Sequence, residues 1–139
     1  MSEHDVEVVR RAFVDFQEGL ARGEFANAFD KGSASPDLVW IIPPNAPGMR
    51  PVYEGREGWI EFMTTWTEDF DWWIEIEELI DVGDGRVVVN THQRAVGKAS
   101  GVPVDLHMGA VWTVEGDQTV RMENYFERAE ALAAAGLSD

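Results

Sequence analysis

The chain has 139 residues, of which 45 % are hydrophobic and 27 % charged; this is the composition of one globular domain and argues against disorder. It contains no cysteine, which excludes a disulfide framework, a thiolate nucleophile and cysteine metal sites. The net charge of −15 repels phosphate backbones and anionic lipid surfaces, so neither nucleic acid nor a membrane is an expected partner.

No targeting or membrane segment is visible in the sequence. The first residues lack the basic and apolar regions of a signal peptide, and no apolar run approaches the roughly 20 residues that a membrane-spanning helix needs. A cytoplasmic location is therefore the expectation.

The N-terminal half predicts three helices and one strand. Apolar residues recur at helical spacing over 6–20, and Gly23 ends this amphipathic segment. A short helix over 24–30 follows, and then come a loop with the sequence KGSASPD and a buried strand, LVWIIP. The stretch 43–51 is too rich in proline for a regular ladder or helix, and a third helix is expected over 56–69.

The C-terminal half predicts strands joined by tight turns. Four segments alternate like strands: WWIEIEELIDV, RVVVNTHQRAV, VDLHMGAVWTV and VRMENYFE. A short helix, ERAEALAAAGL, closes the chain. Sequential hairpins of this length form one twisted sheet, whose apolar face must be covered. The predicted fold is a single α+β domain over residues 1–139: a cone-shaped half-barrel with one curved antiparallel or mixed sheet and three N-terminal-half helices on its concave face.

The order and spacing of these segments resemble a known superfamily. The resemblance is carried by YEGREGWIEFM, GDGRVVV, SGVPVDL, AVWTVEGDQTVRM and NYFERAEALAAAGL. The chain is similar to the nuclear transport factor 2-like superfamily, and within it to the SnoaL-like (polyketide-cyclase-like) proteins, from about Val6 to Leu137. The resemblance implies the cone-shaped fold but not one activity, because the superfamily includes isomerases, cyclases, hydrolases and non-catalytic binding modules.

The catalytic positions of two family branches are altered in this chain. The resemblance to ketosteroid-isomerase-like members matches their catalytic aspartate with Ile42, and their oxyanion-hole tyrosine with a first helix that offers Phe13 and Phe16. The resemblance to limonene-epoxide-hydrolase-like members matches their catalytic aspartate with Asn124. An amide can orient a water or bind a carbonyl oxygen, but it cannot act as a general base.

Asn124 interrupts the apolar face of the last strand. It is either a hydrogen-bonded core amide or a group that lines a ligand pocket. A two-residue turn in the preceding hairpin would place Asn124 opposite Gly109 and Phe126 opposite His107, whereas a three-residue turn would bring Ala110 onto its face. The hairpin lengths of the family favour the first register.

The strand NTHQR places Asn90, His92 and Arg94 on one face. If this face lines the cavity, His92 suits general acid or base work, since histidine titrates near neutrality, and Arg94 can hold a carboxylate or enolate. Alternatively these groups lie on a solvated outer face or at a dimer contact, and a one-residue change of register exchanges the two faces. The candidate catalytic residues are therefore His92, Arg94 and Asn124.

His107 on the neighbouring strand raises the question of a metal site with His92 and Asp105. A third ligand at a recognisable spacing is absent from the sequence. Neither a metal nor another cofactor is therefore expected.

Most aromatic residues occur at helical or strand spacing and are expected in the core, where some can also line a cavity. The residues predicted to bind a ligand are Trp40, Tyr53, Trp59, Met63, Trp66, His107, Met122 and Phe126. Because Trp72 and Trp73 are adjacent in a strand, one of them must face outward, which favours a homodimer through the outer sheet face.

The sequence favours a SnoaL-like domain that binds a hydrophobic small molecule of polyketide-, terpene- or steroid-like character. Whether it is an enzyme stays open. Cofactor-free acid/base chemistry of the isomerase, cyclase or hydrolase type would use the three candidate catalytic residues. The missing aspartates favour the alternative, a non-catalytic ligand-binding or protein-interaction module.

Overall fold

A computed structural model of the chain describes residues 2–43, 46 and 49–137. Within this part of the chain the helices are α1 (Ser2–Arg22), α2 (Asn27–Asp30), α3 (Gly55–Asp69) and α4 (Arg128–Ala134). The strands are β1 (Ala34–Ile41), β2 (Val52–Glu54), β3 (Phe70–Gly83), β4 (Arg86–Gly97), β5 (Pro103–Glu115) and β6 (Gln118–Tyr125).

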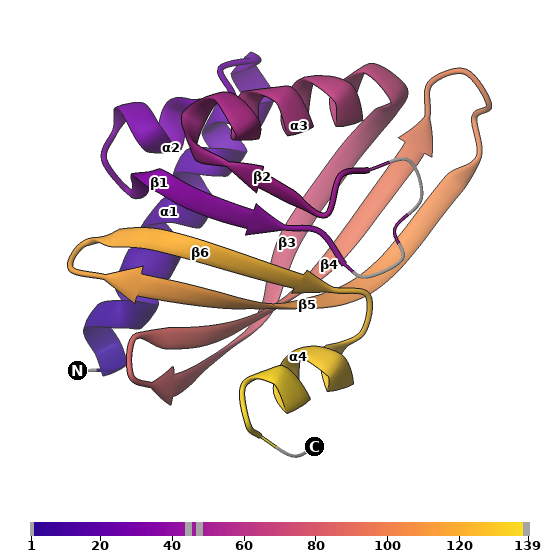
Figure 1. Ribbon diagram of the computed structural model, residues 1–139. Coiled ribbons are helices and arrows are strands. Elements are labelled where there is room, and N and C mark those ends of the chain that lie inside the picture. The colour runs from indigo at the N-terminus through magenta and orange to yellow at the C-terminus, as the bar shows by residue number, and fades with distance from the viewer. Residues whose placement is uncertain (1, 44–45, 47–48, 138–139) are drawn as a thin grey trace.

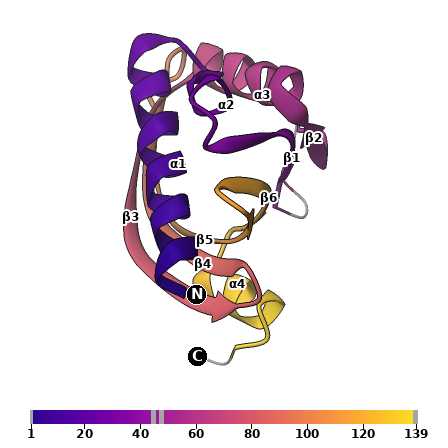
Figure 2. The same ribbon diagram turned by 90° about the vertical axis from the view of Figure 1, so that its left-hand side faces the viewer.

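All six strands form one curved, unclosed sheet in the order β2-β1-β6-β5-β4-β3 (Figure 1). The pairing of β1 with β6 is parallel and the other pairings are antiparallel, so the sheet is mixed. Figure 2 shows the sheet curving around α1, with α4 outside the curve. The predicted cone-shaped α+β fold is confirmed.

Three details of the first half differ from the sequence prediction, the first being that the helix predicted over 24–30 begins only at Asn27. β1 begins at Ala34, within the stretch predicted as a loop, because Ala34 pairs with Thr119 of β6. The register shifts between Ala34 and Val39, around Pro36, which has no backbone N–H to donate. The short strand β2 was not predicted. The proline-rich stretch before it lies partly outside the described residues, at 44–45 and 47–48.

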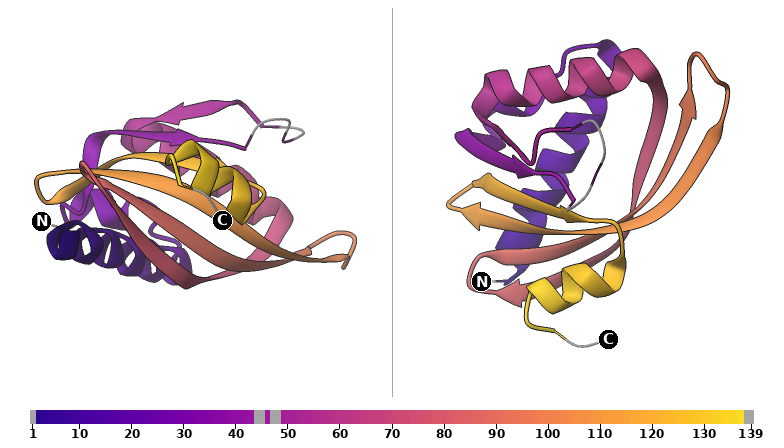
Figure 3. Two further views of the ribbon diagram at one scale, coloured as in Figure 1. Left: turned by 90° about the horizontal axis from the view of Figure 1, so that it is seen from below. Right: turned by 45° about the vertical axis from the view of Figure 1, so that its right-hand side comes forward.

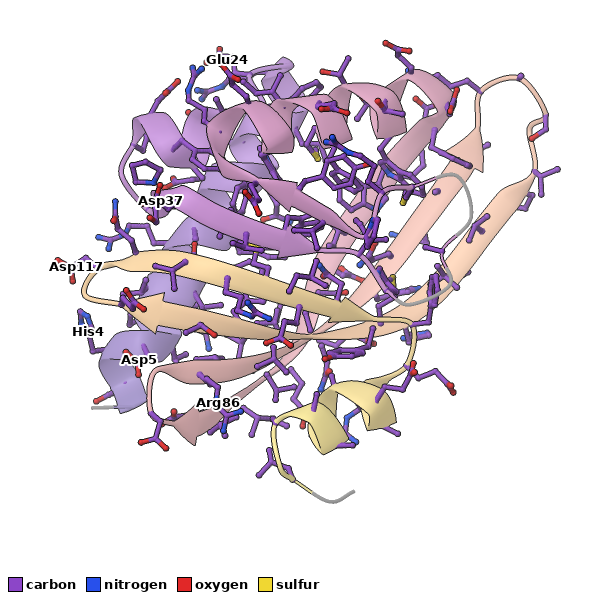
Figure 4. All side chains as sticks on the ribbon, in the orientation of Figure 1. His4, Asp5, Glu24, Asp37, Arg86 and Asp117 are labelled. Atoms are coloured by element: carbon purple, nitrogen blue, oxygen red, sulfur yellow. The ribbon has the colours of Figure 1, made fainter. Side chains whose placement is uncertain are left out.

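Helix α1 packs against the concave face of the sheet through a continuous apolar core. Its buried residues Val9, Ala12 and Phe13 contact a cluster that includes Val89 of β4 and Trp112 of β5. The start of the helix is fixed at the β5–β6 turn, where His4 Nε2 lies 3.2 Å from Asp117 Oδ1 (Figure 4). None of the described helices has the length and apolar composition that crossing a membrane requires.

Helix α4 packs on the opposite, convex face (Figure 3), where Leu132 is buried with Val88 and Val111. Arg128 Nε donates a hydrogen bond of 2.9 Å to Glu78 Oε1, and Asn90 Nδ2 donates another of 2.9 Å to the same oxygen. These two hydrogen bonds, that of Arg128 first, hold the pKa of Glu78 below its usual value. Helix α4 is thus tied to β3 and β4 through one carboxylate.

The β5–β6 hairpin has the predicted two-residue turn, but the register that we derived from it is wrong. Val114 pairs with Thr119, whereas Thr113 pairs with Arg121, so β6 carries one extra residue, Val120. This β-bulge shifts every later pair by one residue and sets Asn124 opposite Ala110 instead of Gly109. Asn124 therefore shares the concave face.

The packing of α4 requires a glycine at position 109. A Cβ atom there would lie 2.7 Å from Ala131 Cβ and 2.9 Å from Asn90 Oδ1. We expect Gly109→Ala to lower the free energy of unfolding by about 1–3 kcal/mol, measured by urea denaturation. In the Ala131→Gly background the same change should cost less, because the nearest atom is gone. Equal costs in the two backgrounds would contradict the contact.

Candidate functional site

An aromatic cluster fills the space between α3, the β1–β2 pair and the concave face of the sheet. Its buried members are Ile42, Tyr53, Trp59, Phe62 and Met63, and partly buried members pack around them: Phe16, Leu20, Phe25, Phe29, Trp40, Ala46, Met49, Trp66 and Trp72. We call this set the aromatic cluster. Helical spacing on α3 brings Trp59, Phe62, Met63 and Trp66 to the same side of the helix, which faces the sheet.

The rings of the aromatic cluster form a connected chain of contacts. Trp40 meets Trp59 edge to face at a centroid distance of 4.6 Å, and it lies 5.4 Å from Phe62. Trp66 stacks on Phe70 at 4.4 Å and meets Trp72 edge to face at 6.0 Å. Contacts of this kind add about 0.5–1.5 kcal/mol each beyond the burial of apolar area.

The indole N–H groups of this cluster are not equally satisfied. Trp59 Nε1 donates to the carbonyl of Phe25 at 2.8 Å, and Trp72 Nε1 donates to Gln93 Oε1 at 3.1 Å. The Nε1 atoms of Trp40 and Trp66 are buried and have no hydrogen-bond acceptor among the described residues. An unsatisfied buried donor costs about 1–3 kcal/mol, so the cluster holds two N–H groups able to bind an acceptor.

Asn124 lies at the end of β6, beside the aromatic cluster. Its Nδ2 donates to the carbonyl of Ile41 at 2.8 Å and to that of Met122 at 3.4 Å. The side chain thus holds the C-terminal end of β1 against β6. Both donors of the amide are directed at the protein backbone, and Oδ1 accepts no hydrogen bond from the residues that the structure describes.

A cleft of about 660 Å³ opens at the free edge of β3. On the concave side it is lined by Leu20, Phe25, Thr67, Phe70 and Trp72, among others, and three of these belong to the aromatic cluster. On the convex side it is lined by Trp73, Glu75, His92 and Arg94. Because β3 is the last strand of the sheet, the cleft extends around its edge to both faces.

The convex face carries a separate polar group, made by β3, β4 and β5. His92 and His107 are paired across β4 and β5, and their rings stack at a centroid distance of 4.3 Å and an angle of 7°. His92 Nε2 lies 2.7 Å from Asp105 Oδ1, and His107 Nδ1 lies 2.8 Å from Glu77 Oε1. The hydrogen bond to Glu77 is the main reason why the pKa of His107 is raised.

Comparison with solved structures agrees with this architecture. A nuclear transport factor 2-like protein from Burkholderia pseudomallei matches with a TM-score of 0.72 and 22 % identity, over 96 % of this chain and 97 % of that one. A putative SnoaL-like polyketide cyclase from Jannaschia sp. matches with a TM-score of 0.72 and 21 % identity, over 100 % and 96 % of the two chains. The chain has the nuclear transport factor 2-like fold.

A third neighbour with this fold, TerC co-crystallised with polyporic acid, has a TM-score of 0.73 and 20 % identity, over 96 % of this chain and 98 % of that one. No protein-family model matches the sequence, and no curated protein matches it. At these identities the solved structures establish the fold only, so the function must be argued from the side chains of this chain.

Most of the predicted ligand-binding residues lie together in the structure, whereas the predicted catalytic residues do not. Of the predicted ligand-binding residues, Trp40, Tyr53, Trp59, Met63 and Trp66 lie in the aromatic cluster. Met122 is buried in the adjoining core, paired with Trp40 across β1 and β6. Phe126 follows the end of β6 and is 39 % exposed.

The predicted catalytic trio is divided between the two faces of the nuclear transport factor 2-like sheet. Asn124 pairs with Ala110 on the concave face, whereas His92, Arg94 and His107 lie on the convex face. The three residues therefore do not converge on one bound atom. Ile42, which the resemblance matches with the isomerase-type aspartate, is buried in the aromatic cluster.

Sequence reasoning missed the contribution of Glu77 to the polar group on the convex face. Ile76 pairs with Thr91 and Glu78 pairs with Asn90, so Glu77 is the extra residue of a second bulge. A bulge re-aims its side chain, and Glu77 reaches across β4 to His107 on β5. Nothing in the spacing of the sequence signals this contact.

The hydrogen bonds of Asn124 predict a structural role that a carboxylate cannot take over. Asn124→Ala should lower the free energy of unfolding by about 1 kcal/mol, because the bond to Ile41 is lost. Asn124→Asp should lower it further at neutral pH, since a carboxylate facing a carbonyl oxygen has no proton to donate. Urea denaturation of both variants measures the difference, and an aspartate variant as stable as the wild type would contradict this role.

The contact with Glu77 predicts the titration of His107. Its pKa should lie above the ordinary 6.5, and Glu77→Gln should lower it toward that value. Because the folded-state pKa is raised, the stabilisation from this contact is complete below pH 6.5 and is lost as the pH rises through the pKa of the folded state. Imidazole chemical shifts followed by NMR against pH measure this, with exposed Glu115→Gln as the control.

Proposed function

We propose that the protein binds a flat, largely apolar small molecule in the aromatic cluster, entering from the cleft at the β3 edge. The ligand carries at least one hydrogen-bond acceptor, such as a carbonyl oxygen, that takes a bond from a tryptophan N–H. The observation that carries the proposal is the pair of buried indole N–H groups, of Trp40 and Trp66, that have no acceptor among the described residues.

The position of Trp66 supports entry from the cleft. Its ring stacks on Phe70 and contacts Trp72, and both of these residues line the cleft. A planar ligand that displaces or intercalates between these rings keeps the aromatic contacts and adds an acceptor for the Trp66 N–H. Trp40 lies deeper, on the other side of Phe62.

The placement of titratable groups favours binding over acid/base catalysis. Among the described residues, Asp15 has the only buried carboxyl group, and it accepts a hydrogen bond of 2.6 Å from Ser33 Oγ. His92 and His107 lie on the convex face. A general base must reach the proton that it removes; the two histidines lie on the face opposite the aromatic cluster, and the Asp15 carboxylate is engaged by Ser33.

The solved neighbours support a small-molecule ligand as a class. TerC was co-crystallised with polyporic acid, and other neighbours are described as putative polyketide cyclases. The acceptor requirement comes from this chain itself, since it follows from two of its own tryptophans.

The proposal predicts a difference between two probes of the same shape. Naphthoquinone, which has carbonyl acceptors, should bind the wild-type protein more tightly than naphthalene, and isothermal titration calorimetry measures both. Trp66→Phe or Trp40→Phe keeps a ring and removes the N–H, so one or both should weaken naphthoquinone binding by about threefold to tenfold, in line with the loss of one hydrogen bond. Binding of naphthalene should change less.

Trp59→Phe is the matched control, because its N–H already binds Phe25 and is not available to a ligand. This variant should reduce the affinities for the two probes by the same factor. Failure of both probes to bind would exclude a ligand site of this kind. Equal affinity for the two probes, unchanged in the Trp40 and Trp66 variants, would leave an apolar site and overturn the role of the N–H groups.

A further inference from the structure

The polar group on the convex face has the composition and geometry of a metal site. One ligand-type atom from each of Glu77, His92 and His107 lies within 4.8 Å of the other two. The three residues come from β3, β4 and β5, which are adjacent in the sheet (Figure 3). We propose that these three side chains bind a divalent transition-metal ion of the zinc type on the convex face of the sheet.

The orientation of the two imidazole rings favours convergence on one ion. Nδ1 of His107 faces Glu77 at 2.8 Å, and Nδ1 of His92 faces Glu75 at 3.4 Å, so both Nδ1 atoms are directed toward β3. Ligand atoms on a tetrahedral zinc lie about 3.3 Å apart, given bonds of about 2.0–2.1 Å. Small rotations of three side chains, two of them more than 40 % exposed, bring atoms within 4.8 Å to that spacing.

Asp105 supplies the outer-shell partner that metal-binding histidines usually have. It accepts a hydrogen bond from His92 Nε2 at 2.7 Å, and it lies 3.9 Å from His107 Nε2. A carboxylate can only accept, so the hydrogen bond to Asp105 forms in the His92 tautomer that carries its proton on Nε2 and leaves the Nδ1 lone pair toward β3. Asp105 thus favours the His92 tautomer that ligation by Nδ1 requires. At His107 the ion takes the place of the Nδ1 proton that faces Glu77.

The local charge also suits a dication. With neutral imidazoles, Glu75, Glu77 and Asp105 place three negative charges around the two rings, and Arg94, opposite Asp105, offsets one of them. The whole chain carries −15, which adds to the attraction. Imidazole nitrogens, in turn, select zinc-type ions over magnesium, which prefers oxygen ligands.

Binding at this site competes with protons, because histidine must be neutral to ligate. Affinity for the ion should therefore fall as the pH is lowered. The site uses other atoms than the proposed ligand, which lies among the rings on the opposite face, although His92 also lines the cleft at the β3 edge.

The test is calorimetric titration of the full chain, freed of metal by chelation, with zinc chloride. We expect one ion per chain, and we expect His92→Gln, His107→Gln and Glu77→Gln each to weaken binding by at least about tenfold. His4→Gln is the matched control: His4 also faces a carboxylate, that of Asp117, but it lies at the β5–β6 turn (Figure 4). This variant should bind zinc as the wild type does.

A second readout uses thermal unfolding, because an ion that binds only the folded state raises the melting temperature. Zinc should raise it for the wild type and for His4→Gln, but not for His107→Gln, and magnesium chloride should not raise it for any of them. Absence of zinc binding by the wild type would overturn the proposal. So would affinity that is unchanged in His107→Gln, or magnesium binding of equal strength.

Discussion

Side-chain alternation along β4 and β5 divides this domain into two chemically different faces, and every other feature depends on that division. Neighbouring residues of a strand point to opposite sides, so Gln93 faces the concave side while His92 and Arg94 face the convex side. No register shift interrupts the β4–β5 pairing, so the sorting is constant along its length. Apolar and aromatic groups collect under α1 and α3, and charged groups collect on the other side.

Four register shifts interrupt the other pairings of the described strands, and two of them, each a bulge, decide the position of one residue of interest. The extra residue Val120 in β6 sets Asn124 beside the concave core, with its donors directed at the end of β1. The extra residue Glu77 in β3 places two consecutive glutamates on the convex face, where Glu77 reaches His107 and Glu78 reaches Arg128. A regular strand would have turned one of these glutamates toward the core.

Most of the fold was predictable from the sequence because its signals are periodic. Helical spacing located α1 and α3, alternation located β3 to β6, and the segments quoted for the resemblance pointed to the fold that the structure confirms. The aromatic cluster was also predictable, since Trp59, Met63 and Trp66 recur on one side of α3.

The errors in the prediction arose where a shift of one residue changes the strand register or the face on which a side chain lies. A bulge leaves no periodic signal, so the register of Asn124 and the reach of Glu77 could not be derived from spacing. A one-residue change of register would also move His92 to the other face of the sheet. Only the observed pairing of β4 with β3 and β5 shows which face it occupies. Long-range partners such as Phe25, which accepts from Trp59, are invisible in sequence for a different reason: the two residues are 34 positions apart.

Several of the acidic residues that give the chain its negative charge lie on the convex face. Glu75, Glu77, Glu78 and Asp105 all project from this face, and like charges at such spacing repel each other. Cationic or proton-accepting side chains lie among them: Arg128 binds Glu78, and the stacked histidines contact the other three. The proposed dication relieves this repulsion, because the imidazole nitrogens hold it among the carboxylates. The polar groups described in and beside the aromatic cluster on the concave face are mostly of another kind, indole N–H groups and the amides of Gln93 and Asn124.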